Sequence, residues 1–263
     1  MRLERARDWL SHVRNPDGSW GYLPGDDGAG EPTLLAVASG EPAPLPWLET
    51  AVLHWSVLMV PMCLHGTPGA DTLIATATEH MLGLKGEIVQ ADFAFDPTIP
   101  AWPWFQGTSP WVEPTAYAVT SLRVQGMEDT ERCRQGVRML RDRQCSDGGW
   151  NYGNPAILGA QLESDLTTTG RVAIALPTSE ATDRALGRLR DALSIPSTEH
   201  LALATLAHVA HGRDGTEFAD ALARRQADDG SFTGRVDRTA LAALAFAAVE
   251  GEPIVFFTQK VPS

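Results

Sequence analysis

The sequence is poor in cysteine. Its three cysteines, Cys63, Cys133 and Cys145, have neither the spacing of a zinc site nor the even number of a disulfide framework. Such sparse cysteine is typical of a reducing compartment. The first 14 residues also lack the apolar core of a signal peptide. We therefore expect a cytoplasmic location.

Positive charge is also in short supply. The 33 acidic residues exceed the 21 Lys and Arg residues, which gives a formal net charge of −12. Because this charge repels phosphate backbones and anionic lipid headgroups, we expect no nucleic-acid partner and no more than weak peripheral contact with a membrane. The longest apolar run, residues 51–64, is shorter than the roughly 20 residues that cross a bilayer. We expect no transmembrane segment.

Motifs for common cofactors are missing as well. The sequence has no Gly-rich phosphate loop, no nucleophile elbow and no CxxC pair. We therefore expect no cofactor and no metal site. The 43% share of hydrophobic residues, with Gly and Pro dispersed along the chain, is instead typical of a folded protein with a substantial core.

One short phrase recurs in three spellings: NPDGSWGY at 15–22, QCSDGGWNYG at 144–153 and QADDGSFTG at 226–234. An amphipathic segment precedes each copy, and a segment that is apolar nearly all round follows it. Because a helix without a polar stripe must be buried on every side, these pairs predict an inner and an outer layer of helices. We expect an all-α fold, a single alpha-alpha toroid over residues 1–263, with about 11–12 helices in five to six pairs.

The predicted helices alternate along the chain, apart from a degenerate unit near residue 40, where Glu41-Pro-Ala-Pro-Leu-Pro leaves no room for an outer helix. Residues 85–112 form a connection longer than the roughly 2–8 residues usual between helices, and long connections are often functional. The outer helices are predicted near 2–14, 70–84, 129–144, 179–194 and 214–226, and the inner ones near 32–39, 48–64, 113–125, 164–176, 197–211 and 236–249.

The repeated Gln, Asp-Gly and Trp phrase resembles the QW motif of squalene-hopene cyclases and related terpenoid cyclases. Residues 109–119, SPWVEPTAYAV, resemble the start of an inner helix in that superfamily. The resemblance covers essentially the whole chain, and similar prenyltransferase and squalene oxidase repeats occur in protein prenyltransferase beta subunits. It implies one closed double ring of helices, where squalene cyclases have two, with a hydrophobic isoprenoid-like molecule as the partner bound in the barrel.

The QW-like residues are expected to tie neighbouring outer helices together. The side-chain amide of Gln144 or Gln226 would lie against an aromatic ring of the adjoining turn. Trp20, Trp150 and Phe232 are therefore predicted to stabilise the fold and to take no part in chemistry.

The resemblance places the family's chemistry at the start of one inner segment. Class II terpenoid cyclases carry Asp-x-Asp-Asp there, and its middle Asp protonates an alkene or epoxide. Residues 165–169 read Asp-Leu-Thr-Thr-Thr, so Asp165 matches the first acid and Thr167 stands in place of the proton donor. The zinc pattern of the prenyltransferases, Asp-x-Cys, also meets Thr167 where its Cys belongs, and His200 is displaced from the family's His. Acid-initiated chemistry would therefore need a substitute acid.

Acidic residues stand near the start of most inner segments, and two explanations stay open. Helix capping is one, because an acid at a helix N-terminus complements the macrodipole. The other is that some carboxylates face the mouth of the barrel, where burial and like-charge crowding raise one pKa and create a general acid. The candidate catalytic acids are Asp165, Glu113 and Glu31, in a set that also includes Glu49 and Asp237.

The long connection supplies candidate substrate-binding residues. Trp102, Trp104 and Trp111 could offer aromatic faces that stabilise a carbocation through the ring quadrupole. The alternative is that these tryptophans pack the connection onto the barrel.

Two further residues are candidates for contact with a substrate. Thr167 stands at the position of the missing proton donor, and Arg171 lies within an otherwise apolar segment. A buried guanidinium needs a partner, which here would be Glu163, Asp165 or a bound anion such as a diphosphate. An ion pair within the protein is the simpler of these expectations.

Two kinds of function remain open from the sequence. One is a terpenoid cyclase-like enzyme, an isomerase or lyase that binds an isoprenoid or other hydrophobic polyene and cyclises or isomerises it with a non-standard acid. The other is a non-catalytic toroid that binds a hydrophobic ligand or a protein partner. The acids near the inner segments favour the first, and the loss of Asp-x-Asp-Asp favours the second.

Overall fold

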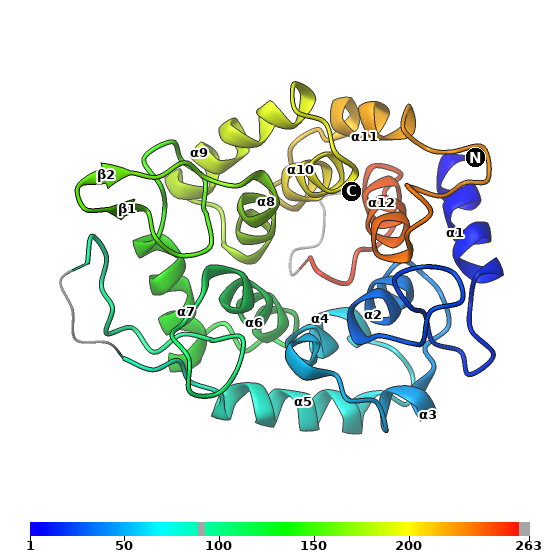
Figure 1. Cartoon of the computed structure of the whole chain (residues 1–263), viewed down its shortest axis with the longest axis horizontal. Coiled ribbons are helices and arrows are strands. Elements are labelled where there is room, and N and C mark those ends of the chain that lie inside the picture. The colour runs from blue at the N-terminus through cyan, green and yellow to red at the C-terminus, as the bar shows by residue number, and fades with distance from the viewer. Residues whose placement is uncertain (89–92, 258–263) are drawn as a thin grey trace.

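Helices make up nearly all of the regular structure in the computed structural model, which describes residues 1–88 and 93–257 (Figure 1). Within these residues the one exception is a pair of two-residue antiparallel strands, β1 (Ala156–Ile157) and β2 (Ala160–Gln161). In this pair Ala156 is opposite Gln161. The predicted all-α fold is confirmed.

Six inner helices of the described chain surround the centre of the molecule. Each contacts the next along the chain, and the last contacts the first, so these helices form a closed ring (Figure 1). They are buried on nearly every face, as expected for helices without a polar stripe. In chain order they are α2 (Gly30–Ala38), α4 (Val60–Leu64), α6 (Val112–Val124), α8 (Leu166–Ala175), α10 (Thr198–Ala210) and α12 (Val236–Val249).

Amphipathic helices pack around the outside of this ring (Figure 1). In one of them Cys133, Gly136, Met139 and Leu140 are buried at helical spacing, while Arg134, Arg138 and Arg141 are exposed. The predicted outer ranges agree with the observed helices apart from their ends. The outer helices are α1 (Arg2–His12), α5 (Asp71–Gly83), α7 (Glu131–Asp142), α9 (Glu180–Leu189), which continues into the 3-10 turn η2 (Arg190–Leu193), and α11 (Thr216–Ala223).

The prediction of one inner helix over residues 48–64 is wrong. The chain there forms the short helix α3 (Leu45–Leu48), an irregular stretch, the 3-10 helix η1 (His54–Met59) and then α4. Pro61 has no N–H for the carbonyl four residues earlier and its ring would clash with that carbonyl, so an α-helix cannot continue through it. His54 has a positive φ of 45°, which also breaks a right-handed helix. The four-residue α3 occupies the unit that the sequence predicts to be degenerate.

One hydrogen bond recurs in four turns of the described chain. In each, the backbone N–H of an aromatic residue donates to a Thr hydroxyl in the following inner helix, at 2.9–3.2 Å. The three indoles among them also donate from Nε1 to a carbonyl of the preceding outer helix, at 2.5–2.8 Å. These bonds fix each turn between its two helices. The pairs are Trp20–Thr33, Trp102–Thr115, Trp150–Thr169 and Phe232–Thr239.

The glutamines of the repeat join neighbouring outer helices through backbone carbonyls. Gln144 donates from Nε2 to the carbonyl of Ala181 in α9 at 2.8 Å, and Gln226 donates to the carbonyl of Arg2 in α1 at 3.0 Å. The second bond links the last outer turn to the first outer helix. In the described residues, guanidinium groups lie over the indoles instead: Arg14 over Trp20, 5.1 Å from the ring centroid, and Arg132 over Trp102, 3.9 Å from it.

The chain turns back into the ring after α12. Gly251, with a φ of +80°, adopts a left-handed conformation that glycine tolerates, and residues 252–257 then run toward the centre of the ring (Figure 1). Glu252 forms an ion pair with Arg7 of α1 at 2.7 Å, which anchors the start of this tail. Across residues 1–88 and 93–257, none of the helices combines the length and the apolar character that crossing a bilayer demands.

Candidate functional site

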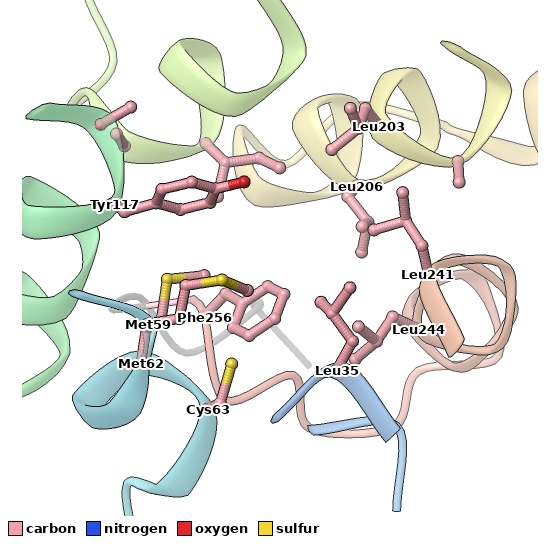
Figure 2. Close-up of a cluster of buried hydrophobic side chains, with 14 of the residues drawn as sticks. Leu35, Met59, Met62, Cys63, Tyr117, Leu203, Leu206, Leu241, Leu244 and Phe256 are labelled. Atoms are coloured by element: carbon pink, nitrogen blue, oxygen red, sulfur yellow. The ribbon is translucent and has the colours of Figure 1, made fainter. Parts of the chain in front are cut away.

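A cavity lies inside the ring, with walls from every inner helix, from η1 and from the tail. The unfilled space around its side chains amounts to about 600 Å³ when space open to solvent is included, and most of it consists of gaps too narrow for a water molecule. Charged groups lie at one end, where the inner helices begin. The rest of the wall is largely apolar, and Figure 2 shows many of these side chains pointing inward: Leu35, Met59, Met62, Leu203, Leu206, Leu241 and Phe256.

The acids of the charged end occupy the same position in their helices. In α2, α6, α10 and α12 the second residue of the helix is acidic and lies at this end. Three of these side chains lie near one arginine from α8, and the fourth lies near Glu31, so the first turns of the helices meet at the same end of the ring. The four acids are Glu31, Glu113, Glu199 and Asp237, and the corresponding residue of α8 is Thr167.

Glu31 is the acid of this end with a raised pKa. Burial is the main cause, and the nearby carboxylates of Asp237 and Glu113 act in the same direction. The hydroxyl of Tyr22, which donates to Oε2 of Glu31 at 2.7 Å, and the guanidinium of Arg171 partly oppose the shift. Burial also raises the pKa of Tyr22, so this phenol stays protonated and remains a donor. Glu31 is therefore a carboxyl group with a raised pKa that lies in the wall of the cavity.

Arg171 links two of the other acids. Its Nη1 donates to Oε1 of Glu113, and its Nη2 lies 3.8 Å from Oε1 of Glu199. Tyr117 donates its hydroxyl to the same Glu113 oxygen at 3.3 Å, and its ring centroid lies 5.6 Å from the guanidinium carbon. The sequence correctly predicts an ion pair for Arg171. However, the partners are Glu113 and Glu199 rather than Glu163 or Asp165.

Asp237 has its own cation. Arg235 binds it in a two-pronged contact, with Nε and Nη2 at 3.0 Å and 2.9 Å from the two carboxylate oxygens. Among the described residues at this end, four carboxyl groups thus face two guanidinium groups. The excess of negative charge disfavours a further negative charge at this end, and for Glu31 it raises the pKa in the same direction as burial does.

Asp165 occupies a different place. It is the N-cap of α8, two residues before Thr167, the position that corresponds to the four acids. Its Oδ1 accepts a hydrogen bond from the backbone N–H of Thr168 at 2.8 Å. It lines an outer groove together with Trp111. Neither Asp165 nor Thr167 lines the central cavity in the described part of the chain. Glu49 is also separate from the four acids, because it directly follows the short helix α3 and does not begin an inner helix.

The three tryptophans of the long connection separate in the structure. Trp102 is fully buried, where its backbone N–H donates to Thr115. It is not among the described residues that line the central cavity. Trp111 is 42% exposed in the outer groove. Trp104 packs edge-to-face on Trp55, with centroids 5.2 Å apart, and Trp55 stacks on Tyr117 at 6.0 Å. Only Trp104 is therefore connected to the cavity wall, through Trp55.

Sequence reasoning missed several residues of this site, namely Tyr22, Trp55, Tyr117, Glu199 and Arg235. Glu199 precedes His200, and the search for a zinc ligand directed attention to the histidine. Glu199 is the second residue after the N-cap Ser197, and this position in its helix could have identified it as a site residue. Trp55 lies in the segment predicted as one helix, where its position gave no sign of a contact with Tyr117.

The chain was compared with known proteins. No family model matches it, and no curated protein sequence does either. Among solved structures, it is similar to the ligand-free type II terpene cyclase MstE from Scytonema, with a TM-score of 0.55 and 16% identity over 97% of this chain and 74% of that one.

Two other structures superpose less well. They are a protein from Actinoplanes, with a TM-score of 0.42 and 15% identity over 95% of this chain and 98% of that one, and a variant of MstE in complex with geranylgeranyl dihydroxybenzoate, with a TM-score of 0.40 and 11% identity over 94% and 96%. The resemblance drawn from the repeats is thus confirmed at the level of architecture: the chain has a terpene-cyclase-like, all-α fold.

Proposed function

We propose that the protein binds an isoprenoid or a similarly apolar polyene in the central cavity, and that Glu31 donates a proton to it. The observation that carries this proposal is the position of Glu31. It is a carboxyl group with a raised pKa, set at the charged end of a cavity whose remaining wall is largely apolar. The similarity of fold to a type II terpene cyclase supports the same class of chemistry.

The raised pKa also bears on the group that accepts the proton. A carboxyl group with a raised pKa is a weaker acid than an ordinary one, and an epoxide oxygen accepts a proton far more readily than an isolated double bond. We therefore expect a polyene that carries an epoxide or a comparable oxygen. Tyr22 occupies Oε2 of Glu31, which leaves Oε1 to hold the transferred proton.

The proposed reaction is an isomerisation, so the product contains the same atoms as the substrate. The proton of Glu31 moves to the epoxide oxygen, the C–O bond breaks, and a hydroxyl group and a tertiary carbocation result. A neighbouring double bond attacks that carbon and closes a ring. The final cation loses a proton to water, and Glu31 regains one from solvent. Tyr117, backed by Trp55, offers its ring to the passing positive charge.

The other charged residues would hold the site in shape. Arg171 holds Glu113 and Glu199 in place through its ion pairs, and the carboxylate of Glu113 disfavours a negative charge on Glu31. Asp165 has no role in this scheme beyond capping α8.

The test is turnover by the purified protein of a panel that contains squalene, its epoxide, and farnesyl and geranylgeranyl diphosphates, with products identified by mass spectrometry. Product from the epoxide that disappears in Glu31→Gln supports the proposal. The matched control is Glu41→Gln, because burial also raises the pKa of Glu41 but this side chain accepts from Ser11, 2.8 Å away, outside the cavity. Equal loss in both variants, or turnover that survives Glu31→Gln, would rule out the assigned acid.

A second candidate function is binding without turnover. The observation in its favour is the narrowness of the cavity, in which most of the unfilled space lies in gaps between side chains. A panel compound that raises the melting temperature, by preferential binding to the folded state, and is recovered unchanged would favour this reading.

A further inference from the structure

The tail after α12 forms part of the cavity wall. Phe256 is 4% exposed and lines the central cavity, where Figure 2 shows its ring beside Met59 and Met62. The walls of the ring are otherwise helical, so Phe256 is a wall residue that a loop delivers. Its position is fixed from outside by the ion pair of Glu252 with Arg7 and by the hydrogen bond from the N–H of Phe257 to the carbonyl of Ile254, at 3.0 Å.

A second, smaller cavity lies on the other side of Phe256. It lies near the ends of α6, α8 and α10, opposite the four acids, and its unfilled space amounts to about 290 Å³ when space open to solvent is included. Among the described residues, just two line both cavities, Phe256 and Ile174. Phe257 lines the smaller cavity but not the central one. The side chains of Phe256 and Ile174 therefore lie between the two spaces, and Phe256 is the one that the tail supplies.

We propose that Phe256 is the floor of the ligand cavity and sets the length of the apolar chain that the cavity accepts. This inference rests on the proposed binding of a polyene from the acidic end. A chain whose head lies at Glu31 extends away from the charged end and meets the phenyl ring. Removal of that ring would open a connection between the central space and the smaller space below it.

The expected gain in chain length follows from the burial of apolar groups. Each buried CH₂ group contributes about 0.8 kcal/mol, so one additional five-carbon isoprene unit that reaches the lower space strengthens binding well beyond tenfold if it is fully accommodated. Incomplete packing reduces this gain. We therefore expect Phe256→Ala to shift the ratio of affinities for the C20 and C15 alcohols by about tenfold or more in favour of C20.

The experiment measures binding of geraniol, farnesol and geranylgeraniol to the full chain, by melting temperature and by tryptophan fluorescence. Phe256→Ala is compared with the wild type. Phe257→Ala is the matched control, because this neighbouring phenylalanine borders the lower space alone. Phe256→Leu is a milder change with the same expected direction, in case the Ala variant does not fold, and Phe256→Trp is expected to shift preference toward the shorter alcohols.

The outcomes separate this inference from the proposed function. A longer preferred chain in Phe256→Ala or Phe256→Leu, with Phe257→Ala like the wild type, supports the inference. Wild-type binding with the same chain-length preference in all variants overturns it and leaves the proposed function intact. Binding that appears only when Phe256 is made smaller supports Phe256 as the floor but overturns ligand binding by the native cavity. No binding by any form overturns both.

Discussion

The starts of α2 and α8 look alike in sequence and differ in the structure. Both place an acid shortly before a threonine that accepts the N–H of a buried tryptophan, Thr33 in α2 and Thr169 in α8. Counted from those threonines, Glu31 lies two residues earlier and Asp165 four residues earlier. That shift of two residues makes Glu31 a member of the cavity wall and Asp165 a helix cap. The position of an acid relative to the helix start, more than its presence, decides whether it serves chemistry or stability.

The largest expected difference between Glu31 and Asp165 is in their effect on turnover. Glu31→Gln is expected to lower turnover of an epoxide-bearing polyene by roughly 10²–10⁴-fold, the usual contribution of a general acid. Asp165→Asn is expected to leave turnover within a few-fold of the wild type, because Asn caps a helix about as well as Asp. Initial rates by mass spectrometry measure both. The reverse order of the two effects would make Asp165 the acid.

Where the two helix starts are alike, equal effects are expected. Thr33→Val and Thr169→Val each remove the acceptor of a buried tryptophan N–H, which leaves that group without its partner. Each substitution is expected to cost about 1–3 kcal/mol of unfolding free energy. Urea denaturation followed by far-UV circular dichroism measures the loss. A large difference between the two variants would show that the repeated contact is not equivalent in the two units.

The capping role of Asp165 gives a smaller and specific effect. Asp165→Ala removes the acceptor for the N–H of Thr168 and is expected to cost about 0.5–2 kcal/mol, while Asp165→Asn costs much less. The same denaturation experiment compares them. Equal losses for Ala and Asn would point to the charge of Asp165 rather than to its cap hydrogen bond.

The smallest expected effect is a change in the pH dependence of stability. Because folding raises the pKa of Glu31, the folded state holds more protons than the unfolded state above the ordinary carboxyl pKa of about 4.5. The contribution of Glu31 therefore becomes less favourable as the pH rises from that value to the raised folded pKa. Glu31→Gln is expected to flatten this part of the dependence of stability on pH. Glu41→Gln, at another acid whose pKa burial raises, is expected to leave the contribution of Glu31 unchanged. Melting temperatures from pH 4 to pH 8, about the range in which carboxyl shifts of this kind act, provide the measurement.

Periodicity predicted most of the helices because burial on all sides or on one side leaves a distinct pattern of apolar residues. It failed at residues 48–64, where the composition is apolar but Pro61 and the backbone of His54 interrupt the helix. Apolar character reports burial, and a chain can be buried without being a continuous helix. Trp102 escaped the repeat search for a related reason: its contacts are those of Trp20 and Trp150, but the turn before it lacks Asp-Gly.

The sequence indicated acids near the inner segments but not which of them meet. Contacts such as Arg171 with Glu113 join residues 58 positions apart, and they depend on the curvature of the whole ring. Local sequence pattern contains no information about that curvature. The matching of Asp165 to a family motif was likewise a statement about chain position, and the side chain at that position turned out to bind the backbone of its own helix.

The bond from Gln226 to the carbonyl of Arg2, together with the packing of α1 on α12, has a topological consequence. In an open solenoid the two end repeats need special polar caps, because each would otherwise expose an apolar face. Here the last outer turn covers the first outer helix, so every repeat of the described ring is an interior one. A repeat could be neither added nor removed without reopening the circle. Changes in the capacity of this barrel must therefore come from side chains such as Phe256, not from the number of units.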